Sequence, residues 1–211
     1  MPTDILWTGP ERAAVTVLLA HGAGGAMDSP WLNDIAGLLG ERGIRVGRFE
    51  FGYMAARRSG TRRAVPRAEL VRDEYLAVVE QVRAAGDSVG ALYIGGKSYG
   101  GRVASLVADE LHDAGEIRGL VCLGYPFHPP GKPQQLRTAH LTGIRTPTLV
   151  CQGTRDPFGG PAEVAGYGLS PAVTVTWFDG DHGMIPLKSA GISRPLAAVA
   201  DAVAAFVAEG P

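Results

Sequence analysis

Residues 96–100 read Gly-Lys-Ser-Tyr-Gly, which places Ser98 at the centre of a Gly-x-Ser-x-Gly motif. This spacing is typical of a serine nucleophile on a sharp turn from a strand into a helix, where a strained backbone exposes the hydroxyl. Glycines flank the serine because the neighbouring backbone leaves no room for side chains there. The motif is weak evidence by itself, and it requires a strand before it and a helix after it.

A serine hydroxyl is a poor nucleophile at neutral pH and requires a base that a carboxylate orients. His182 and Asp156 each follow an apolar run, at residues 173–178 and 148–153 respectively. The order serine, aspartate, histidine along the chain is that of hydrolases with this turn. An isolated Asp-Pro pair is often only a turn, and an isolated histidine is often a surface residue. Taken together, these positions predict a catalytic triad of Ser98, His182 and Asp156.

Two other acidic residues, Asp179 and Asp181, compete for the role of the triad acid. Both lie so close to His182 in sequence that they are poorly placed to orient its ring from across a site. We therefore assign the acid to Asp156.

Acyl transfer also needs backbone N–H groups that stabilise a developing oxyanion. Tyr99, the residue after the nucleophile, supplies one of them by its position. The second is expected from the loop after an early strand, where residues 21–25 read His-Gly-Ala-Gly-Gly. We assign this N–H to Ala23, with Gly24 as the alternative. His21 is expected to brace the loop by hydrogen bonding rather than to take part in the chemistry.

Short apolar runs rich in β-branched residues alternate with stretches of helical spacing along the chain. The runs are typical of strands buried on both faces of a parallel sheet, and they cover residues 15–20, 44–51, 89–95, 119–124, 148–153 and 173–178. The helical stretches cover residues 31–40, 67–85, 102–114 and 195–209, with Ser29 as the N-cap of the first. This alternation predicts an α/β fold with a doubly wound, mostly parallel sheet, in one domain over residues 1–211. It also supplies the strand and the helix that the Ser98 motif requires.

Two long stretches without a periodic pattern, residues 52–66 and 125–146, each follow a predicted strand. They are expected at the carboxyl edge of the sheet, where open α/β folds bind ligands. The first stretch and its end carry five arginines, Arg57, Arg58, Arg62, Arg63 and Arg67. One interpretation is a solvated loop, and the other is a positive rim, with Arg62 as a contact, for anionic or acyl-phosphate-like substrates or an acidic partner. In the second stretch, His128 and Lys132 are candidate substrate contacts, and the alternative for His128 is a packing or surface role.

The chain has 211 residues, of which 45% are hydrophobic and 19% charged, with a formal net charge of -1. These values fit a well-packed core and argue against a general binder of nucleic acid or membrane surfaces. The first residues lack the features of a signal peptide, and no apolar run approaches the roughly 20 residues that span a bilayer, so a soluble cytoplasmic protein is expected. Cys122 and Cys151 fit neither a disulfide scaffold nor a zinc site. No metal or organic cofactor is expected, and the oligomeric state stays open.

The Gly-Lys-Ser sequence at residues 96–98 also resembles the end of a phosphate-binding loop. That motif requires a glycine five residues before Gly96, where this chain has Ala91, and residues 92–94 are strand-like. No acidic residue ends a later strand in a clear position to bind Mg²⁺. Nucleotide hydrolysis is therefore disfavoured.

With these motifs the chain resembles the α/β-hydrolases. It looks close to the small lidless enzymes of the dienelactone-hydrolase type. Within these it resembles a family of predicted hydrolases that also includes a subunit of the non-specific-lethal chromatin complex. The motifs that carry the resemblance are residues 21–25 with 27–30, 96–102, 124–133, 153–159 and 180–182. The resemblance implies the triad and the oxyanion hole named above, but little about the substrate. A chain of this length has no room for a helical cap, so an open, shallow cleft is expected.

The expected function is that of a serine esterase, which cleaves an ester, lactone or related carbonyl of a small molecule through an acyl-enzyme on Ser98. A binding or scaffold protein with a hydrolase fold is the first alternative, suggested by the chromatin relative. The presence of all three triad residue types disfavours it. Transfer of the acyl group to an acceptor other than water is the second alternative, and it would use the same residues.

Overall fold

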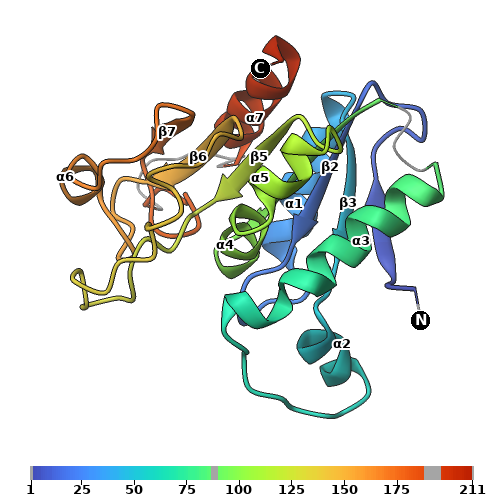
Figure 1. The fold of residues 1–211 in the computed structure, drawn as a ribbon, viewed down its shortest axis with the longest axis horizontal. Coiled ribbons are helices and arrows are strands. Elements are labelled where there is room, and N and C mark those ends of the chain that lie inside the picture. Colours follow the sequence, from blue (N-terminus) through green and yellow to red (C-terminus); the bar gives the residue numbers. More distant parts are fainter. Residues whose placement is uncertain (1, 87–89, 188–195, 211) are drawn as a thin grey trace.

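A computed structural model describes residues 2–86, 90–187 and 196–210, and in it the chain forms a sheet with helices on both faces (Figure 1). The strands are β1 (Ile5–Thr8), β2 (Val15–Ala20), β3 (Arg45–Phe49), β4 (Ala91–Lys97), β5 (Gly119–Leu123), β6 (Thr148–Gly153) and β7 (Val173–Phe178). Their order across the sheet is β1-β3-β2-β4-β5-β6-β7. Only the edge strand β1 is antiparallel among the described pairings, so the predicted mostly parallel, doubly wound α/β fold is confirmed.

Strand β4 lies in the middle of the sheet, between β2 and β5. Its register pairs Ala20 of β2 with Gly96, and Leu123 of β5 with Lys97. The carboxyl ends of β2, β4 and β5 therefore meet at one edge, directly before Ser98. In an open α/β sheet this is the edge where ligands bind.

The helices form two layers. Helices α1 (Pro30–Glu41) and α7 (Ala197–Glu209) cover one face, and α3 (Arg72–Ala84), α4 (Tyr99–Ser105) and α5 (Ala108–Asp113) cover the other (Figure 1). Each layer buries an apolar cluster against the sheet, with Leu39 and Val203 in the first and Val79 and Val103 in the second. None of the helices in the described part of the chain is long and apolar enough to cross a membrane.

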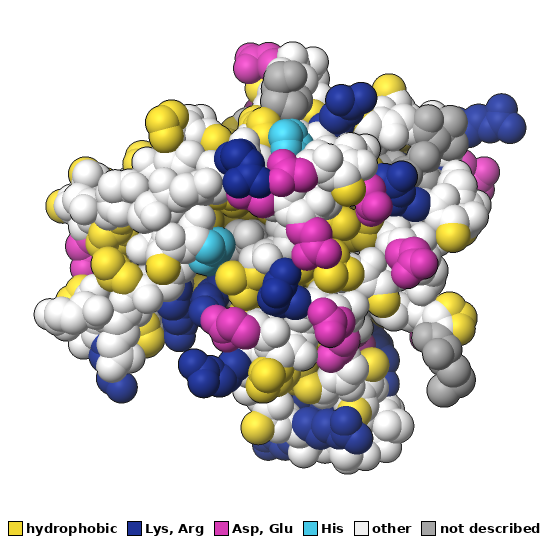
Figure 2. Space-filling model, in the orientation of Figure 1, with side chains coloured by type: hydrophobic (Ala, Val, Ile, Leu, Met, Phe, Trp, Pro, Cys, Tyr) yellow, Lys and Arg dark blue, Asp and Glu magenta, His cyan; other side chains and the backbone are white. Residues whose placement is uncertain are grey.

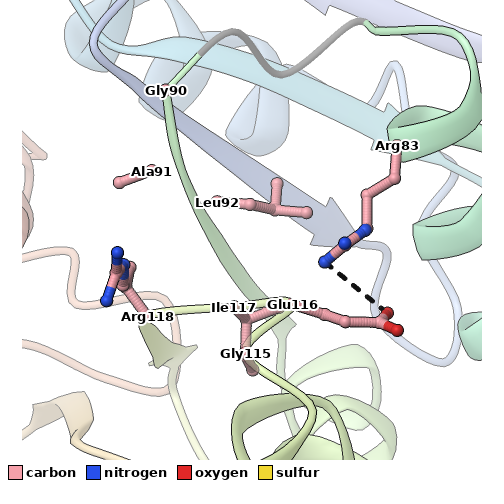
Figure 3. Close-up of a pocket in the computed structure, with 8 residues that line it drawn as sticks. All are labelled: Arg83, Gly90, Ala91, Leu92, Gly115, Glu116, Ile117 and Arg118. Carbon is pink, nitrogen blue, oxygen red and sulfur yellow. Dashed lines mark ion pairs between the residues drawn. The ribbon is translucent and has the colours of Figure 1, made fainter.

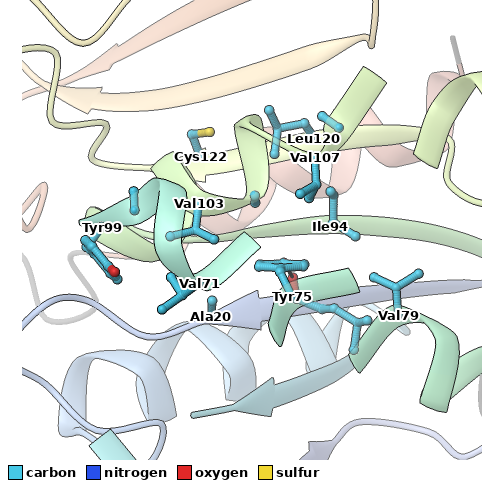
Figure 4. Packing of buried hydrophobic residues seen from close by; sticks show 14 of the residues in the cluster. Ala20, Val71, Tyr75, Val79, Ile94, Tyr99, Val103, Val107, Leu120 and Cys122 are labelled. Atoms are coloured by element: carbon cyan, nitrogen blue, oxygen red, sulfur yellow. Dashed lines mark hydrogen bonds between the residues drawn. The ribbon is translucent and has the colours of Figure 1, made fainter. Parts of the chain in front are cut away.

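A buried tyrosine of α3 connects this packing to the strand that carries the motif. The Tyr75 hydroxyl accepts a hydrogen bond from the Gly95 N–H (3.0 Å) and donates one to the Gly95 carbonyl (2.7 Å). Figure 4 shows its ring among Val71, Val79 and Ile94, in the layer between α3 and the sheet. The backbone of β4 is thus fixed three residues before Ser98.

The prediction of one helix over residues 102–114 is wrong, because the chain forms α4 and α5 with a break between them. At the break, the N–H groups of Leu106 and Val107 donate to carbonyls only three residues back, at Val103 and Ala104. The Ser105 hydroxyl also donates to the Arg102 carbonyl (2.7 Å), a local bond that competes with regular helical pairing. The helical spacing of apolar residues continues across the break, so the sequence pattern does not reveal it.

The stretch 52–66 is not wholly irregular, as the sequence suggested, because α2 (Gly52–Arg58) occupies its first half. This helix buries Tyr53 and Met54, and two apolar positions are too few to give a periodic signal. The predicted helix over 67–85 begins as a 3-10 turn, η1 (Ala68–Val71), before α3. Strand β1 and the short helix α6 (Pro161–Val164) were not predicted, since each has only four residues.

Smaller differences concern the ends of elements. The predicted strand 89–95 extends to Lys97 in the structure, whereas 44–51 and 119–124 are shorter there. Ser29 is the N-cap residue of α1 but makes no side-chain capping hydrogen bond. Two predicted starting residues, Val89 and Pro195, lie outside the described residues.

Candidate active site

Ser98 lies on a sharp turn between β4 and α4. Its backbone angles are φ 51° and ψ −110°, a strained conformation for a residue with a side chain. The turn is held by a hydrogen bond from the Ser98 N–H to the Leu123 carbonyl (3.0 Å). A Cβ atom at Gly100 would lie 2.4 Å from the Ala20 carbonyl oxygen, and one at Gly96 would lie 2.6 Å from the same atom. Glycine is therefore required on both sides of the serine, because α4 packs against the backbone of β2.

Asp156 and His182 come together at the carboxyl edge of the sheet. The His182 Nδ1 lies 2.7 Å from the Asp156 Oδ2, and the Asp156 side chain is fully buried. The carboxylate also accepts hydrogen bonds from the Phe158 N–H (2.9 Å) and from the Gln152 Nε2 (2.8 Å). Because the carboxylate accepts a hydrogen bond from the Nδ1–H, the neutral ring carries no hydrogen on Nε2, and this nitrogen can act as a base.

The loop that carries His182 is clamped from two other elements. The Lys97 ammonium of β4 donates to the His182 carbonyl, and the Trp31 Nε1 of α1 donates to the Gly183 carbonyl (2.8 Å). The Lys97 Nζ also lies 5.0 Å from the centre of the Trp31 ring, within the range of a cation–π contact. Burial lowers the pKa of Lys97 to about 8, although the charges of Asp156 and Asp181 act in the opposite direction.

Gly124 makes this clamp possible at the end of β5. Its φ is +70°, and a Cβ atom there would lie 2.6 Å from the Lys97 Nζ and 2.7 Å from the His182 carbonyl oxygen. A side chain at this position would push apart the two groups that hold the histidine loop.

The two acids that compete with Asp156 have other partners. Asp179 forms an ion pair with Arg155, and the Asp181 carboxylate accepts a hydrogen bond from the Gly183 N–H (2.7 Å). Neither contact involves the ring of His182.

The loop after β2 is held by hydrogen bonds around Ala23. The His21 Nδ1 donates to the Gly22 carbonyl (2.6 Å), and its Nε2 accepts the Phe51 N–H (3.2 Å). Burial lowers the pKa of His21, which agrees with a neutral ring in this role. The Tyr53 hydroxyl donates to the Ala23 carbonyl (3.2 Å). His21 thus braces the loop on which the predicted oxyanion donor Ala23 lies.

A cavity of about 570 Å³ opens beside Ser98. It is lined by Ala23, Val65, Pro66, Arg67, Ala68, Glu69, Ser98, Tyr99, Arg102, Pro126, Arg137 and Phe158. The predicted nucleophile and both predicted oxyanion donors thus face one space. Phe158 lines this space and packs against His182, with 4.3 Å between the centres of the two rings. Within the described part of the chain the Ser98 hydroxyl makes no hydrogen bond, and contacts of this kind often tighten only when substrate binds.

The remaining predicted contacts lie elsewhere. The described residues that line this cavity do not include Gly24, Arg62, His128 or Lys132. Gly24, Arg62 and Lys132 are exposed, whereas His128 is buried and faces α6, with its Nε2 3.5 Å from a Glu163 oxygen. Of the five arginines of the first long stretch, Arg67 alone lines the cavity. Arg58 instead pairs with Glu50 and Asp28.

A second hollow, of about 370 Å³, lies at the opposite edge of the sheet, around the start of β4 (Figure 3). It is lined by Arg83, Gly90, Ala91, Leu92, Gly115, Glu116, Ile117 and Arg118, and an ion pair between Arg83 and Glu116 (3.9 Å) crosses it. The described residues that line it include one carboxylate, that of Glu116, which is paired with Arg83, and no serine, cysteine or histidine. The candidate site therefore remains the cavity beside Ser98. Among the described residues, no group of three or more His, Cys, Asp or Glu side chains is placed to hold a metal ion.

Sequence reasoning missed several residues of the site. Lys97 and Gln152 lie inside strands, where their roles depend on the neighbouring strand and on the turn after it. Arg137 was not singled out, although it lies in the stretch 125–146 that was expected at the ligand-binding edge. The helical pattern over residues 102–114 indicates only that a helix begins at Arg102. A charged residue in a loop at this edge is the signal that would have indicated Arg137.

The comparison with known families agrees with this architecture. A family model described as an alpha/beta hydrolase domain matches residues 13–208. The chain belongs to the alpha/beta hydrolase family. The further resemblance to the family that includes a chromatin-complex subunit stays a prediction.

Several solved structures share the fold of this chain. A dienelactone hydrolase from Anabaena variabilis has a TM-score of 0.75 at 20% identity, over 99% of this chain and 92% of that one. XC6422 from Xanthomonas campestris, described as a serine hydrolase without a lid, has a TM-score of 0.70 at 23% identity, over 98% and 88%. Est1E from Butyrivibrio proteoclasticus, with ferulic acid bound, has a TM-score of 0.74 at 16% identity, over 98% and 94%. At these identities the likeness concerns the fold. Like XC6422, the described part of this chain carries no cap domain.

Proposed function

We propose that this alpha/beta hydrolase is a serine hydrolase that cleaves an ester, lactone or related carbonyl through an acyl-enzyme on Ser98. The observation that carries the proposal is the strained backbone of Ser98, at the same sheet edge as the His182–Asp156 pair. Strain of this kind persists only where the surrounding structure enforces it, and it is commonly found at functional positions. The names of the structural neighbours, which include a serine hydrolase, an esterase and a dienelactone hydrolase, support the same class of reaction.

In the first half of the reaction, His182 Nε2 takes the proton of the Ser98 hydroxyl while Oγ bonds to the substrate carbonyl carbon. The carbonyl oxygen becomes an oxyanion, which the N–H groups of Tyr99 and Ala23 stabilise. Asp156 holds the ring and stabilises its positive charge. When the tetrahedral intermediate collapses, the bond to the alcohol oxygen breaks, and His182 returns the proton to that oxygen.

In the second half, His182 takes a proton from water, whose oxygen bonds to the acyl carbon. The Ser98 Oγ then leaves and receives the proton from His182, which releases the carboxylic acid and restores the starting state. The Tyr99 N–H suits the oxyanion role because it occupies the first position of α4, where the helix offers it no carbonyl partner.

Labelling with a fluorophosphonate probe tests this proposal, because the probe reacts with activated serines. We expect the native protein to be labelled, and we expect the heat-denatured protein and the Ser98→Ala variant to remain unlabelled. A panel of small esters and lactones would then measure turnover, which Ser98→Ala and His182→Ala should abolish with the fold intact. Absence of labelling in folded wild-type protein would contradict the proposal and favour a binding role for the same cavity.

A further inference from the structure

The cavity beside Ser98 contains more positive charge than the proposed reaction needs. Three arginine residues line it, Arg67, Arg102 and Arg137, together with one glutamate, Glu69. These residues come from three separate parts of the chain, namely η1 and the loop before it, α4, and the loop after β5. Figure 2 shows Lys and Arg side chains gathered around an acidic one on this face, below and to the left of α4.

Glu69 compensates for only part of this charge. Its Oε1 lies 2.6 Å from the Nη2 of Arg102. A hydrogen bond with its own backbone, followed by the charges of Arg102 and Arg67, lowers the pKa of Glu69. The carboxyl group is therefore ionised at neutral pH, and one negative charge faces three positive ones.

Arg137 is the guanidinium with the least compensation. It is half-buried, and its guanidinium forms no ion pair or hydrogen bond with the other described residues. Burial, followed by repulsion from Arg102, lowers the pKa of Arg137, which reflects the cost of its position. The backbone of Arg137 is nevertheless fixed, since its N–H donates to the Phe127 carbonyl (2.8 Å) and its carbonyl accepts the Tyr125 hydroxyl (3.1 Å).

Arg102 provides a second hydrogen-bond donor that lacks a partner among the described residues. Its Nε is buried and has no hydrogen-bond partner within the described part of the chain. A buried donor without a partner is costly, and the cost is removed when a ligand supplies an acceptor. Arginine matches the planar geometry of a carboxylate, and a cavity of about 570 Å³ is large enough for a small ligand.

We propose that Arg137, with Arg67 and Arg102 beside it, forms a subsite for a carboxylate carried by the substrate, so that the preferred substrates are esters whose acyl part ends in a carboxylate. This inference rests on the proposed function, because it takes the attacked carbonyl to lie at Ser98. It differs from the positive rim suggested by the sequence, since Arg62 does not line the cavity and Arg137 comes from another loop.

The test compares two substrates that differ only at the end of the acyl chain. These are the mono-4-nitrophenyl ester of glutaric acid and 4-nitrophenyl pentanoate, in which a methyl group replaces the carboxylate. We expect the wild type to favour the glutarate ester in kcat/KM, and Arg137→Gln to lower this preference by roughly tenfold or more, the effect of losing a charged hydrogen bond. Arg118→Gln removes the same charge at the opposite edge of the sheet, and it should keep the wild-type preference.

Two outcomes separate failure of the subsite from failure of the proposed function. Turnover of both esters with the same preference in wild type and Arg137→Gln would overturn the subsite and leave the hydrolase proposal standing. Absence of both turnover and Ser98 labelling would overturn the hydrolase proposal. Calorimetric binding of glutarate to the wild type and to Arg137→Gln then decides the subsite separately. A roughly tenfold weaker affinity in the variant supports it, and equal affinities overturn it.

Discussion

Asp156 Oδ2 accepts hydrogen bonds from the His182 ring and the Gln152 amide, while Oδ1 accepts the Phe158 N–H. Each donor has a hydrogen to give, so the site requires an acceptor at both oxygens. An asparagine at this position would present an NH₂ group to at least one donor. The position therefore requires the charge and the two acceptor oxygens of Asp156, and the similar shape of an asparagine is not sufficient.

On the proposed mechanism, Asp156→Asn should lower kcat about 10³- to 10⁴-fold, since the ring of His182 would lose its orientation and the stabilisation of its charge. The measurement is steady-state turnover of an activated ester, with circular dichroism to verify the fold. Asp179→Asn is the matched control, because Asp179 pairs with Arg155 at the surface, and it should reduce kcat less than threefold. A loss below tenfold in Asp156→Asn would assign the acid elsewhere.

The ionisation of Lys97 should make the activity of the site depend on pH. Its pKa is lowered to about 8, and the charged groups that act on it are Asp156 and Asp181. As the pH rises through 8, the ammonium loses its charge, and its hydrogen bond to the His182 carbonyl weakens. We expect kcat of the wild type to fall several-fold between pH 7 and pH 9. Lys97→Met should have a lower kcat than the wild type at pH 7, and its kcat should not fall between pH 7 and pH 9. If the kcat of the variant falls over this range as that of the wild type does, Lys97 is not the source of the pH dependence.

Residues with a motif can be predicted from the sequence, whereas residues that support them cannot. Ser98 has its glycines, and Asp156 and His182 each directly follow a strand. Gln152 lies within an apolar run, and nothing local distinguishes it from a core residue. Its function depends on the turn that follows β6, because this turn brings Asp156, four residues later in the sequence, back beside the Gln152 side chain.

At the scale of elements, the position of Ser98 depends on how closely α4 approaches β2. A Cβ atom at Gly100 would meet the carbonyl oxygens of Ala20 and His21 at 2.4 and 2.6 Å, both of them backbone atoms that side-chain rotation cannot relieve. Gly37 in α1, by contrast, has open space around its Cβ position.

These two glycines give opposite predictions for the same substitution. Gly100→Ala should lower the free energy of unfolding by about 1–3 kcal/mol, because α4 must move away from β2. Gly37→Ala should raise it by roughly 0.5–1 kcal/mol, because alanine is the better helix former. Urea denaturation measures both changes. A Gly100→Ala variant as stable as the wild type would show that α4 does not pack this closely.

The elements that could be predicted are those with enough apolar positions to give a period. Strands β2, β6 and β7 have the predicted bounds, since each is a continuous run between turns. The separation of α4 from α5 could not be predicted, because Leu106 and Val107 keep the helical spacing at the point where the hydrogen bonds change.

For the molecule as a whole, the net charge of -1 does not reveal that positive and negative residues are unevenly distributed. The sequence contains nearly equal numbers of acidic and basic residues, yet the cavity beside Ser98 is lined by three arginines and one glutamate. Arg67, Arg102 and Arg137 are up to 70 positions apart, and only the fold brings them to one space. The sequence therefore predicts the edge of the sheet at which the cavity lies and one of its arginines, Arg67, but not that Arg102 and Arg137 line the same cavity.

The same region affects the stability of the whole chain in acid. His140 lies in the loop after β5, and its Nε2 is 2.8 Å from the Ser105 hydroxyl at the end of α4. Burial, followed by repulsion from Arg102, lowers its pKa to about 4, whereas an unfolded chain has a histidine pKa near 6.5. Between these two pKa values, His140 is therefore mostly neutral in the folded state and mostly protonated in the unfolded state. This contribution to stability is complete above pH 6.5 and is lost as the pH falls toward 4.

We therefore expect the free energy of unfolding of the wild type to drop through this interval, with about 1–2 kcal/mol due to His140 after allowance for its partial exposure. His140→Gln keeps a hydrogen-bonding group but cannot titrate, so its stability should change less between pH 6.5 and pH 4. His112→Gln, at the end of α5, is the control for loss of a histidine and should keep the wild-type slope. Urea denaturation at several pH values measures the slopes, and equal slopes in wild type and His140→Gln would mean that the acid sensitivity arises at other groups.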